Sequence, residues 1–169
     1  MITLLANQGL PPMDPDAFER QAVSLAQVIL SLPPEMQIGA ETSHHFAPGV
    51  YIRTLKAPAG SILIGHKHHT EFLNIVEKGV IQVCGNGDTI TFVEGDKVVS
   101  KAGIRKVGFA MTDVVWTTVH ENPTNEHDID KLEAQLCDLE SAKVIYPEER
   151  AVFERLFGLN TIEGGQQLL

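Results

Sequence analysis

The 169-residue chain has only two cysteines, Cys84 and Cys137, and is poor in basic residues. Two cysteines this far apart give neither a disulfide framework nor the paired spacing of a zinc site, so we expect free thiols in a reducing compartment. Thirteen Lys and Arg against 22 Asp and Glu give a net charge of −9, which argues against a nucleic-acid partner because phosphate binding needs clustered positive charge. No apolar run approaches the ~20 residues of a membrane span, and no signal peptide is recognisable.

Apolar residues make up 43% of the chain, which is enough for a single domain with its own core. We expect residues 1–13 to be an extended lead-in and residues 35–48, with Glu41, His44 and His45, to be a loop. Between them the sequence predicts an amphipathic helix, capped by Asp14 and ended by Pro33-Pro34. Apolar residues recur in it at helical spacing, namely Phe18, Ala22, Leu25, Ile29 and Leu32.

From residue 50 the pattern changes to short apolar runs separated by Gly-containing turn signals. Closely spaced strands of this kind predict an antiparallel double-sheet jelly roll or a small closed barrel. The predicted strands are Val50–Lys56, Ser61–His68, Phe72–Val76, Val80–Cys84, Thr89–Val93, Lys97–Val99, Arg105–Ala110 and Val114–His120.

Helical patterns return after Pro123. Thr124 or Asp128 caps the first of them, and Pro147 opens a second over Glu148–Phe157 that Gly158 ends. Ile129, Leu132, Leu136 and Leu139 form the apolar stripe of the first helix. We therefore expect three parts: an N-terminal arm and helix over 1–49, a β-barrel over 50–122, and C-terminal helices and tail over 123–169. Helices at both ends of a barrel cover a sheet edge or bind a partner, so we expect a homo-oligomer with protein partners.

The segment between residues 60 and 79 gathers three histidines and a carboxylate. Because alternate residues of a strand share a face, His66 and His68 point the same way. Two imidazoles are half of a metal site. Glu71 would complete a two-histidine, one-carboxylate set that suits iron, manganese, nickel or zinc.

This segment resembles the first motif of the cupin superfamily, a family of double-stranded β-helix barrels that commonly hold a metal. The matching positions are Gly60, His66, His68 and Gly79. Glu71 comes one residue too early, and Phe72 stands where the family has its glutamate. A one-residue shift turns a side chain to the other face of a strand, so Glu71 reaches the interior only through a local bulge.

The second cupin motif is present only in part. Gly95 and Gly103 match it, but Lys101 replaces its proline and Ala110 replaces its asparagine. Lys106 stands where the family has its third metal-binding histidine. An ammonium group there repels a divalent cation unless it loses its proton, so we do not expect the three-histidine, one-glutamate centre of the family.

Three interpretations of this partial site remain open. In the first, His66 and His68 bind a metal together with Glu71 or His120. In the second, the charge of Lys106 takes the place of the metal and holds an anionic ligand such as a carboxylate. In the third, the polar residues pair among themselves in a barrel that is kept for its shape. The candidate residues are His66, His68, Glu71 and His120 for a divalent metal, and Lys106 and Asn74 for a ligand.

A second resemblance is to small cupin-like proteins encoded by tailed bacteriophages. It rests on three segments, Gly65–His68, Lys78-Gly79 and Trp116–His120. The resemblance implies a structural or interaction subunit of a phage particle, found in the virion or the host cytoplasm. The alternatives are a metal-dependent cupin enzyme, of dioxygenase or isomerase type, acting on a small acid, or a small-ligand-binding protein without catalysis.

Overall fold

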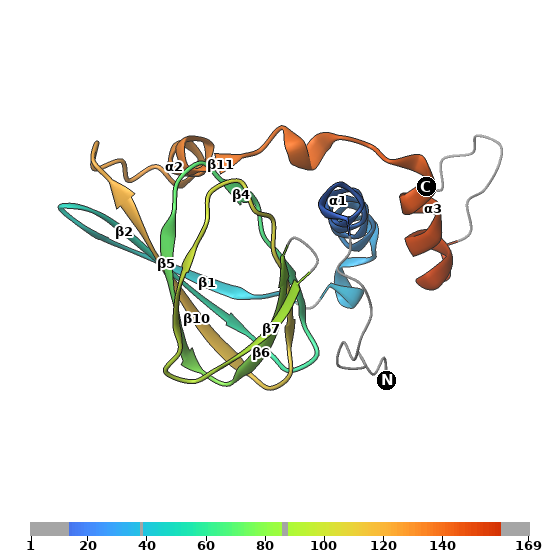
Figure 1. The fold of residues 1–169 in the computed structure, drawn as a ribbon, viewed down its shortest axis with the longest axis horizontal. Helices are drawn as coiled ribbons and strands as arrows, with labels where there is room; N and C mark the ends of the chain where they lie inside the picture. The colour runs from blue at the N-terminus through green and yellow to red at the C-terminus, as the bar shows by residue number, and fades with distance from the viewer. Residues whose placement is uncertain (1–13, 38, 86–87, 160–169) are drawn as a thin grey trace.

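Antiparallel strands form most of the structure, a computed structural model that describes residues 14–37, 39–85 and 88–159. Two sheets face each other and form a barrel of the jelly-roll class, with helices at both ends of the chain (Figure 1). The predicted mainly-β fold with helical extensions is therefore confirmed. The lead-in expected over residues 1–13 and the tail expected from residue 160 lie outside the described residues.

The larger sheet has five strands in the order β1-β2-β10-β5-β8. These strands are β1 (Glu41–Ala47), β2 (Gly49–Ala57), β10 (Val114–Asn122), β5 (Phe72–Lys78) and β8 (Lys97–Ser100). The smaller sheet has the order β3-β9-β6-β7. Its strands are β3 (Ile62–Ile64), β9 (Val107–Ala110), β6 (Val80–Gly85) and β7 (Asp88–Val93).

The predicted strand Ser61–His68 is broken in two. Its first part is β3, and its second is the short β4 (Lys67–His68), which pairs with β11 (Cys137–Asp138). His66 lies between these two strands in irregular backbone. The break lets the chain pass from the smaller sheet to the C-terminal segment that covers the end of the barrel.

The prediction of a loop over residues 35–48 is wrong in its second half, because β1 occupies Glu41–Ala47. This strand pairs with β2 through a two-residue turn at Pro48-Gly49, where Gly49 has a φ of 74°. The Pro-Gly pair was the available signal for a hairpin. The barrel therefore begins before residue 50, with His44 on the inner face of β1, where its Nδ1 lies 2.7 Å from the Tyr51 hydroxyl.

The predicted helices are present, but the one after Pro123 ends at Leu136, so Leu139 of its predicted apolar stripe lies beyond the helix and after β11. Helix α1 (Pro15–Ser31) is capped by Asp14, whose side chain accepts a hydrogen bond from the Ala17 amide at 3.0 Å. Asp128, rather than Thr124, caps α2 (Ile129–Leu136), and α3 (Pro147–Leu156) begins at the proline. Helix α2 covers one end of the barrel, and α1 lies between the barrel and α3 (Figure 1). Within the described ranges, no helix is long and apolar enough to cross a membrane.

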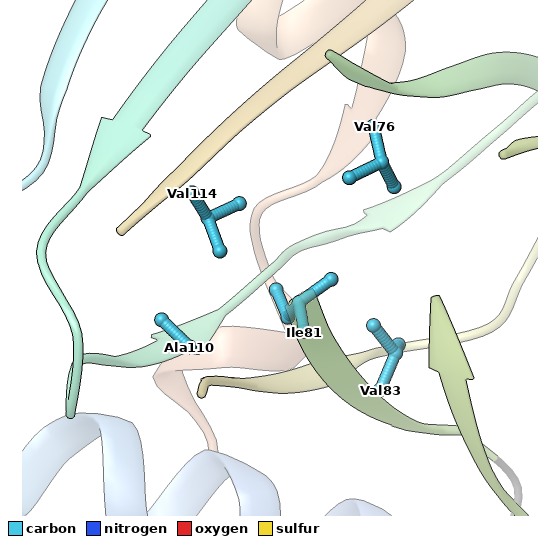
Figure 2. Close-up of a cluster of buried hydrophobic side chains, with 5 residues drawn as sticks. All are labelled: Val76, Ile81, Val83, Ala110 and Val114. Atoms are coloured by element: carbon cyan, nitrogen blue, oxygen red, sulfur yellow. The ribbon is translucent and has the colours of Figure 1, made fainter. Parts of the chain in front are cut away.

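Two apolar clusters fill the two ends of the barrel. The first, shown in Figure 2, lies where the β5–β6 and β9–β10 turns are, and its buried members are Val76, Ile81, Val83, Ala110 and Val114. The second lies under α2, and its buried members are Tyr51, Leu132, Leu136 and Cys137. Cys137 and Cys84 are free thiols, as expected.

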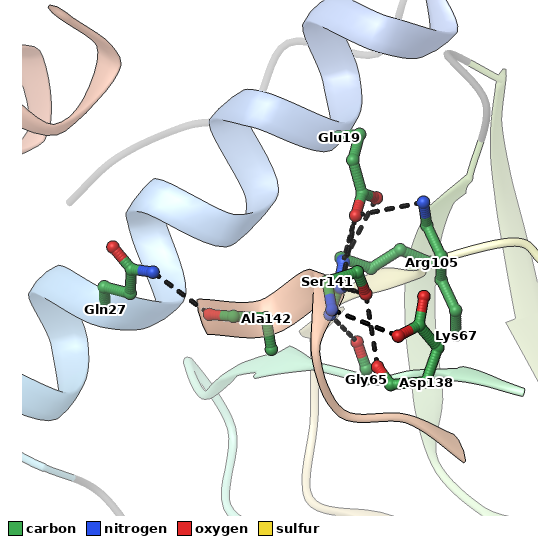
Figure 3. Close-up of polar contacts among 8 residues, drawn as sticks. All are labelled: Glu19, Gln27, Gly65, Lys67, Arg105, Asp138, Ser141 and Ala142. Atoms are coloured by element: carbon green, nitrogen blue, oxygen red, sulfur yellow. Dashed lines mark hydrogen bonds and ion pairs between the residues drawn. The ribbon is translucent and has the colours of Figure 1, made fainter. Parts of the chain in front are cut away.

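A buried ion-pair cluster ties α1 to the barrel (Figure 3). The Arg105 side chain, only 2% exposed, donates to both carboxylate oxygens of Glu19 at 3.1 to 3.2 Å. Lys67 Nζ lies 3.1 Å from the same carboxylate. Arg105 also donates to the Gly65 carbonyl oxygen and to Ser141 Oγ. Because these bonds reach α1, the barrel and the segment after β11, they fix the position of α1 beside the barrel.

Candidate functional site

The inner face of the five-stranded sheet carries side chains in three rows, which the pairing register defines. Alternate residues of each strand share this face, so a step of two residues along a strand leads from one row to the next. The apolar row contains Leu55, Trp116 and Val76; the polar row contains Arg53, Thr118 and Asn74; the aromatic row contains Tyr51, His120 and Phe72. The interior therefore changes from apolar to polar within the length of the barrel.

A pocket of about 620 Å³ opens onto these rows. Volumes of roughly 300–1,000 Å³ are typical of small-molecule sites. One part of its wall is polar, formed by Arg53, His66, His68, Asn74, Lys106, Thr118 and Glu133. The rest is mostly apolar and comes from the larger sheet, from the smaller sheet around β3, and from the C-terminal end of α1. The structure thus brings four of the six predicted site residues, His66, His68, Asn74 and Lys106, to one pocket.

Lys106 places a half-buried ammonium group in the polar part of the pocket. Its Nζ donates to Ser100 Oγ and to Asn74 Oδ1, the latter at 3.4 Å, and lies 4.6 Å from the centre of the Phe72 ring. Burial lowers the pKa of Lys106 from 10.5 to about 8. Among the described residues, no carboxylate forms an ion pair with this group. Lys106 is therefore a cation at neutral pH that is held by neutral groups alone.

Asn74 organises the hydrogen bonds around Lys106. Its Nδ2 donates to Ser100 Oγ at 2.7 Å and to the Val98 carbonyl oxygen at 3.1 Å, which fixes the orientation of the amide. Its Oδ1 accepts from Lys106 and from Trp116 Nε1, the latter at 3.2 Å. Asn74 is 1% exposed. A fixed, buried acceptor of this kind holds the ammonium group in one place.

The histidines of the site are held in the neutral form. Burial, followed by the charges of Arg53 and Lys106, lowers the pKa of His68 to about 4. Burial, followed by repulsion from His68, lowers the pKa of His120 to about 3. The two rings stack with their centres 5.1 Å apart. His120 is therefore a neighbour of His68 behind the pocket wall rather than part of the lining.

Two ring nitrogens near the pocket have unmet hydrogen-bonding capacity. Nδ1 of His66 and Nδ1 of His120 are buried without a hydrogen-bond partner among the described residues. Burial, followed by the charge of Arg105, also lowers the pKa of His66. Neutral imidazoles whose Nδ1 has no partner contribute a polar atom to the interior without adding charge.

Glu71 is not brought to the site. Its carboxylate is exposed and accepts a hydrogen bond from Lys101 Nζ at 2.8 Å, outside the pocket. No bulge turns it inward, because Phe72 takes the inward position and packs against His68, with the ring centres 4.1 Å apart and the planes tilted by 42°. The side chain at the family's glutamate position is thus an aromatic ring.

The residues present do not fit a divalent metal. In the described part of the chain, no three His, Cys, Asp or Glu side chains are grouped so that they could hold a metal ion. The positive charge of Lys106 lies close enough to His68 and His120 to lower the pKa of both, and the same charge opposes a cation. We therefore derive no chemical step through a metal.

Sequence reasoning missed three polar residues of the wall, Arg53, Thr118 and Glu133. Arg53 Nη1 lies 3.6 Å from Glu133 Oε1, so a residue of β2 pairs with a residue of α2 across the pocket. The alternation of β2 and β10 would have placed Arg53 and Thr118 on one face of each strand. Their approach to Asn74, however, depends on strand pairing that a single sequence does not reveal.

No family profile matches the chain, and no curated protein matches it. Solved structures with a similar fold include a cupin-2 domain protein and an RmlC-like cupin, both from Shewanella frigidimarina, and a cupin superfamily protein from Desulfitobacterium hafniense. Their identities to this chain are 14%, 13% and 12%, with TM-scores of 0.42, 0.46 and 0.45. They cover 48%, 55% and 53% of this chain and 80%, 82% and 88% of their own. Similarity at this level concerns the barrel fold and gives no information about a ligand.

Proposed function

We propose that this barrel binds a small organic carboxylate, with Lys106 as the group that holds the carboxylate oxygens. The observation that carries the proposal is the half-buried ammonium group in the polar wall of the pocket without a carboxylate partner among the described residues. Burying a charge is costly unless an opposite charge compensates it, and a bound anion would supply that compensation. This is the second of the three interpretations of the partial cupin site.

The neighbours of Lys106 support an anion rather than a cation as the ligand. The Lys106 ammonium group donates to the side-chain oxygens of Asn74 and Ser100. Because an ammonium group has three N–H donors, one donor is left for a ligand. His66, kept neutral by burial and with no hydrogen-bond partner for its Nδ1 among the described residues, can donate one N–H to a carboxylate without carrying charge into the interior. The Lys106 ammonium group and a histidine N–H are sufficient to bind and orient an anion.

The single tryptophan of the chain, Trp116, provides the measurement. It lines the pocket and bonds to the same Asn74 oxygen as Lys106, so a bound ligand changes its fluorescence. Titration with hexanoate at pH 7 is expected to give saturable binding. Lys106→Met is expected to weaken binding at least tenfold, because hydrogen bonds to a charged group contribute about 1.5–3 kcal/mol.

Lys101→Met is the matched control, since Lys101 is an exposed lysine whose partner is Glu71 outside the pocket. It is expected to leave the affinity within twofold of wild type. Absence of saturable binding to the wild-type protein, or equal binding by the Lys106→Met variant, would refute the proposal.

A role as a subunit of a phage particle, and the homo-oligomer with protein partners that goes with it, stay predictions. The geometry of the barrel does not bear on them, and a ligand-binding barrel is compatible with either setting. A metal-dependent enzyme is the less favoured alternative, because Glu71 lies outside the pocket and Lys106 places a positive charge next to the histidines.

A further inference from the structure

The pocket has an apolar part whose size and lining bear on the shape of the ligand. Resting on the proposed function, we infer that the ligand is an amphipathic monocarboxylate, with an unbranched or simple apolar body and few hydroxyl groups. The carboxylate lies at Lys106 and the apolar body extends from the polar row toward the apolar row and the end of α1. Three independent features of the lining carry this inference.

The first feature is the change of polarity along the strands. Leu55 follows Arg53 by two residues on β2, and Trp116 precedes Thr118 by two residues on β10. Two residues of a strand span about 7 Å, so the lining becomes apolar within about the length of a short alkyl chain. Across the pocket, Leu63 and Val83 of the smaller sheet continue the apolar surface. A methylene chain that leaves Lys106 in this direction meets hydrocarbon on both sides.

The second feature is the contribution of the N-terminal helix. Ile29 and Leu32 from the end of α1, together with Met36, complete the lining. Helix α1 is fixed to the barrel by the Glu19–Arg105 pair, so these side chains have a defined position. The pocket is therefore lined by apolar side chains on this side.

The third feature is that polar groups near the apolar lining already have hydrogen-bond partners within the protein. Ser61 Oγ already donates to the Pro58 carbonyl oxygen at 2.7 Å, and Gln37 Nε2 donates to the Leu32 carbonyl oxygen at 2.6 Å. A hydroxylated body such as that of a sugar acid would lose hydrogen bonds to water and find few replacements here.

The charges of the wall favour a single carboxylate. Arg53 and Glu133 form an ion pair with each other, so Lys106 is the cation of the described lining that has no carboxylate partner. A second carboxylate on the ligand would lie in apolar surroundings or near Glu133, and both are unfavourable. Dicarboxylates are therefore expected to bind more weakly than monocarboxylates of the same length.

The test is a panel of carboxylates measured by Trp116 fluorescence and by calorimetry at pH 7. Butanoate, hexanoate and octanoate vary the apolar body, gluconate adds hydroxyl groups to six carbons, and adipate adds a second carboxylate. Affinity is expected to rise by up to about fourfold per methylene, the value for full burial. Hexanoate is expected to bind at least tenfold more tightly than gluconate or adipate.

Matched variants locate the apolar part. Leu55→Asn, on the inner face of β2, is expected to abolish most of the gain from butanoate to octanoate, and Leu73→Asn, on the outer face of β5, is expected to retain it. Met36→Gln changes an exposed lining residue without disturbing the barrel and is expected to reduce the gain between hexanoate and octanoate.

The outcomes separate the two proposals. Binding of gluconate or adipate that equals or exceeds that of hexanoate, and that Lys106→Met still weakens, overturns the amphipathic ligand and leaves the carboxylate site in place. An affinity that does not change from butanoate to octanoate also overturns the amphipathic ligand and leaves the carboxylate site in place. Failure of every carboxylate to bind, or binding that is indifferent to Lys106→Met, overturns the proposed function itself.

Discussion

The two halves of the barrel interior differ in what their side chains do for folding. The cluster of Val76, Ile81, Val83, Ala110 and Val114 is apolar throughout, and each member stabilises the barrel by leaving water. The polar row and its neighbours are buried or half-buried, but among the described residues they include a cation without an ion-pair partner and imidazole nitrogens without a hydrogen-bond partner. Folding gains little from such groups. The comparison therefore assigns stability mainly to the first region and the carboxylate contacts to the second, with Val83 belonging both to the apolar cluster and to the pocket lining.

The largest expected effect comes from the apolar region. Ile81→Ala removes a side chain that is 3% exposed, and cavity formation is expected to lower the free energy of unfolding by about 2–4 kcal/mol, measured by denaturant unfolding. Ile90→Ala, on the exposed face of β7, serves as the control and is expected to change it by less than about 0.5 kcal/mol. Hexanoate affinity of folded Ile81→Ala protein is expected to stay within threefold of wild type. A much larger loss of affinity would break the division between the regions.

The second prediction concerns acid stability. The pKa of His120 is lowered to about 3 in the folded protein, so between pH 6.5 and 3 the unfolded chain binds a proton that the folded chain does not. The free energy of unfolding therefore falls as the pH drops through this window, by about 2 kcal/mol from this group between pH 7 and pH 5. His120→Phe keeps a ring between Tyr51 and Phe72 and is expected to lose that part of the pH dependence.

His45→Phe is the control for this experiment, because His45 is exposed on β1. Its free energy of unfolding is expected to fall between pH 7 and pH 5 by the same amount as that of wild type. A His120→Phe variant with the wild-type difference would mean that the buried imidazole is not the source of the acid sensitivity.

The smallest expected effect on stability comes from the polar region. Lys106→Met replaces a half-buried cation by an apolar side chain of similar length, and the free energy of unfolding at pH 7 is expected to rise by about 1 kcal/mol. Denaturant unfolding measures this change, and the loss of carboxylate binding is measured on the same variant. A decrease of several kcal/mol in the free energy of unfolding would show that Lys106 stabilises the fold, and would contradict the division between the two regions.

Much of the fold could be predicted from the sequence, because strands and turns leave local signals. Runs of β-formers between Gly-containing turns gave most strands of the barrel, and Asp14 and Pro15 marked the start of α1. The exceptions were the break between β3 and β4, the short β11, and β1, where Glu41–Ala47 has few apolar residues. This strand is stabilised by its pairing with β2, which is information about another part of the chain.

The candidate site could be predicted only in part. Motif spacing singled out His66, His68 and Lys106, and all three line the pocket. Spacing indicated that Glu71 reaches the interior only through a local bulge, but it could not show that no bulge forms and that Glu71 pairs with Lys101 outside the pocket. Nor could it place Arg53 opposite Glu133, since the pair joins β2 to α2 over 80 positions of the chain.

Proton uptake on binding tests the role of Lys106 most directly. Its pKa of about 8 means that the free protein has mostly lost this proton at pH 9, and a bound carboxylate favours its return. Calorimetry of hexanoate binding at pH 9, in buffers of different ionisation enthalpy, is expected to show uptake of close to one proton, with almost none at pH 7 and none for Lys106→Met. Binding at pH 9 without proton uptake by the wild-type protein would contradict the account.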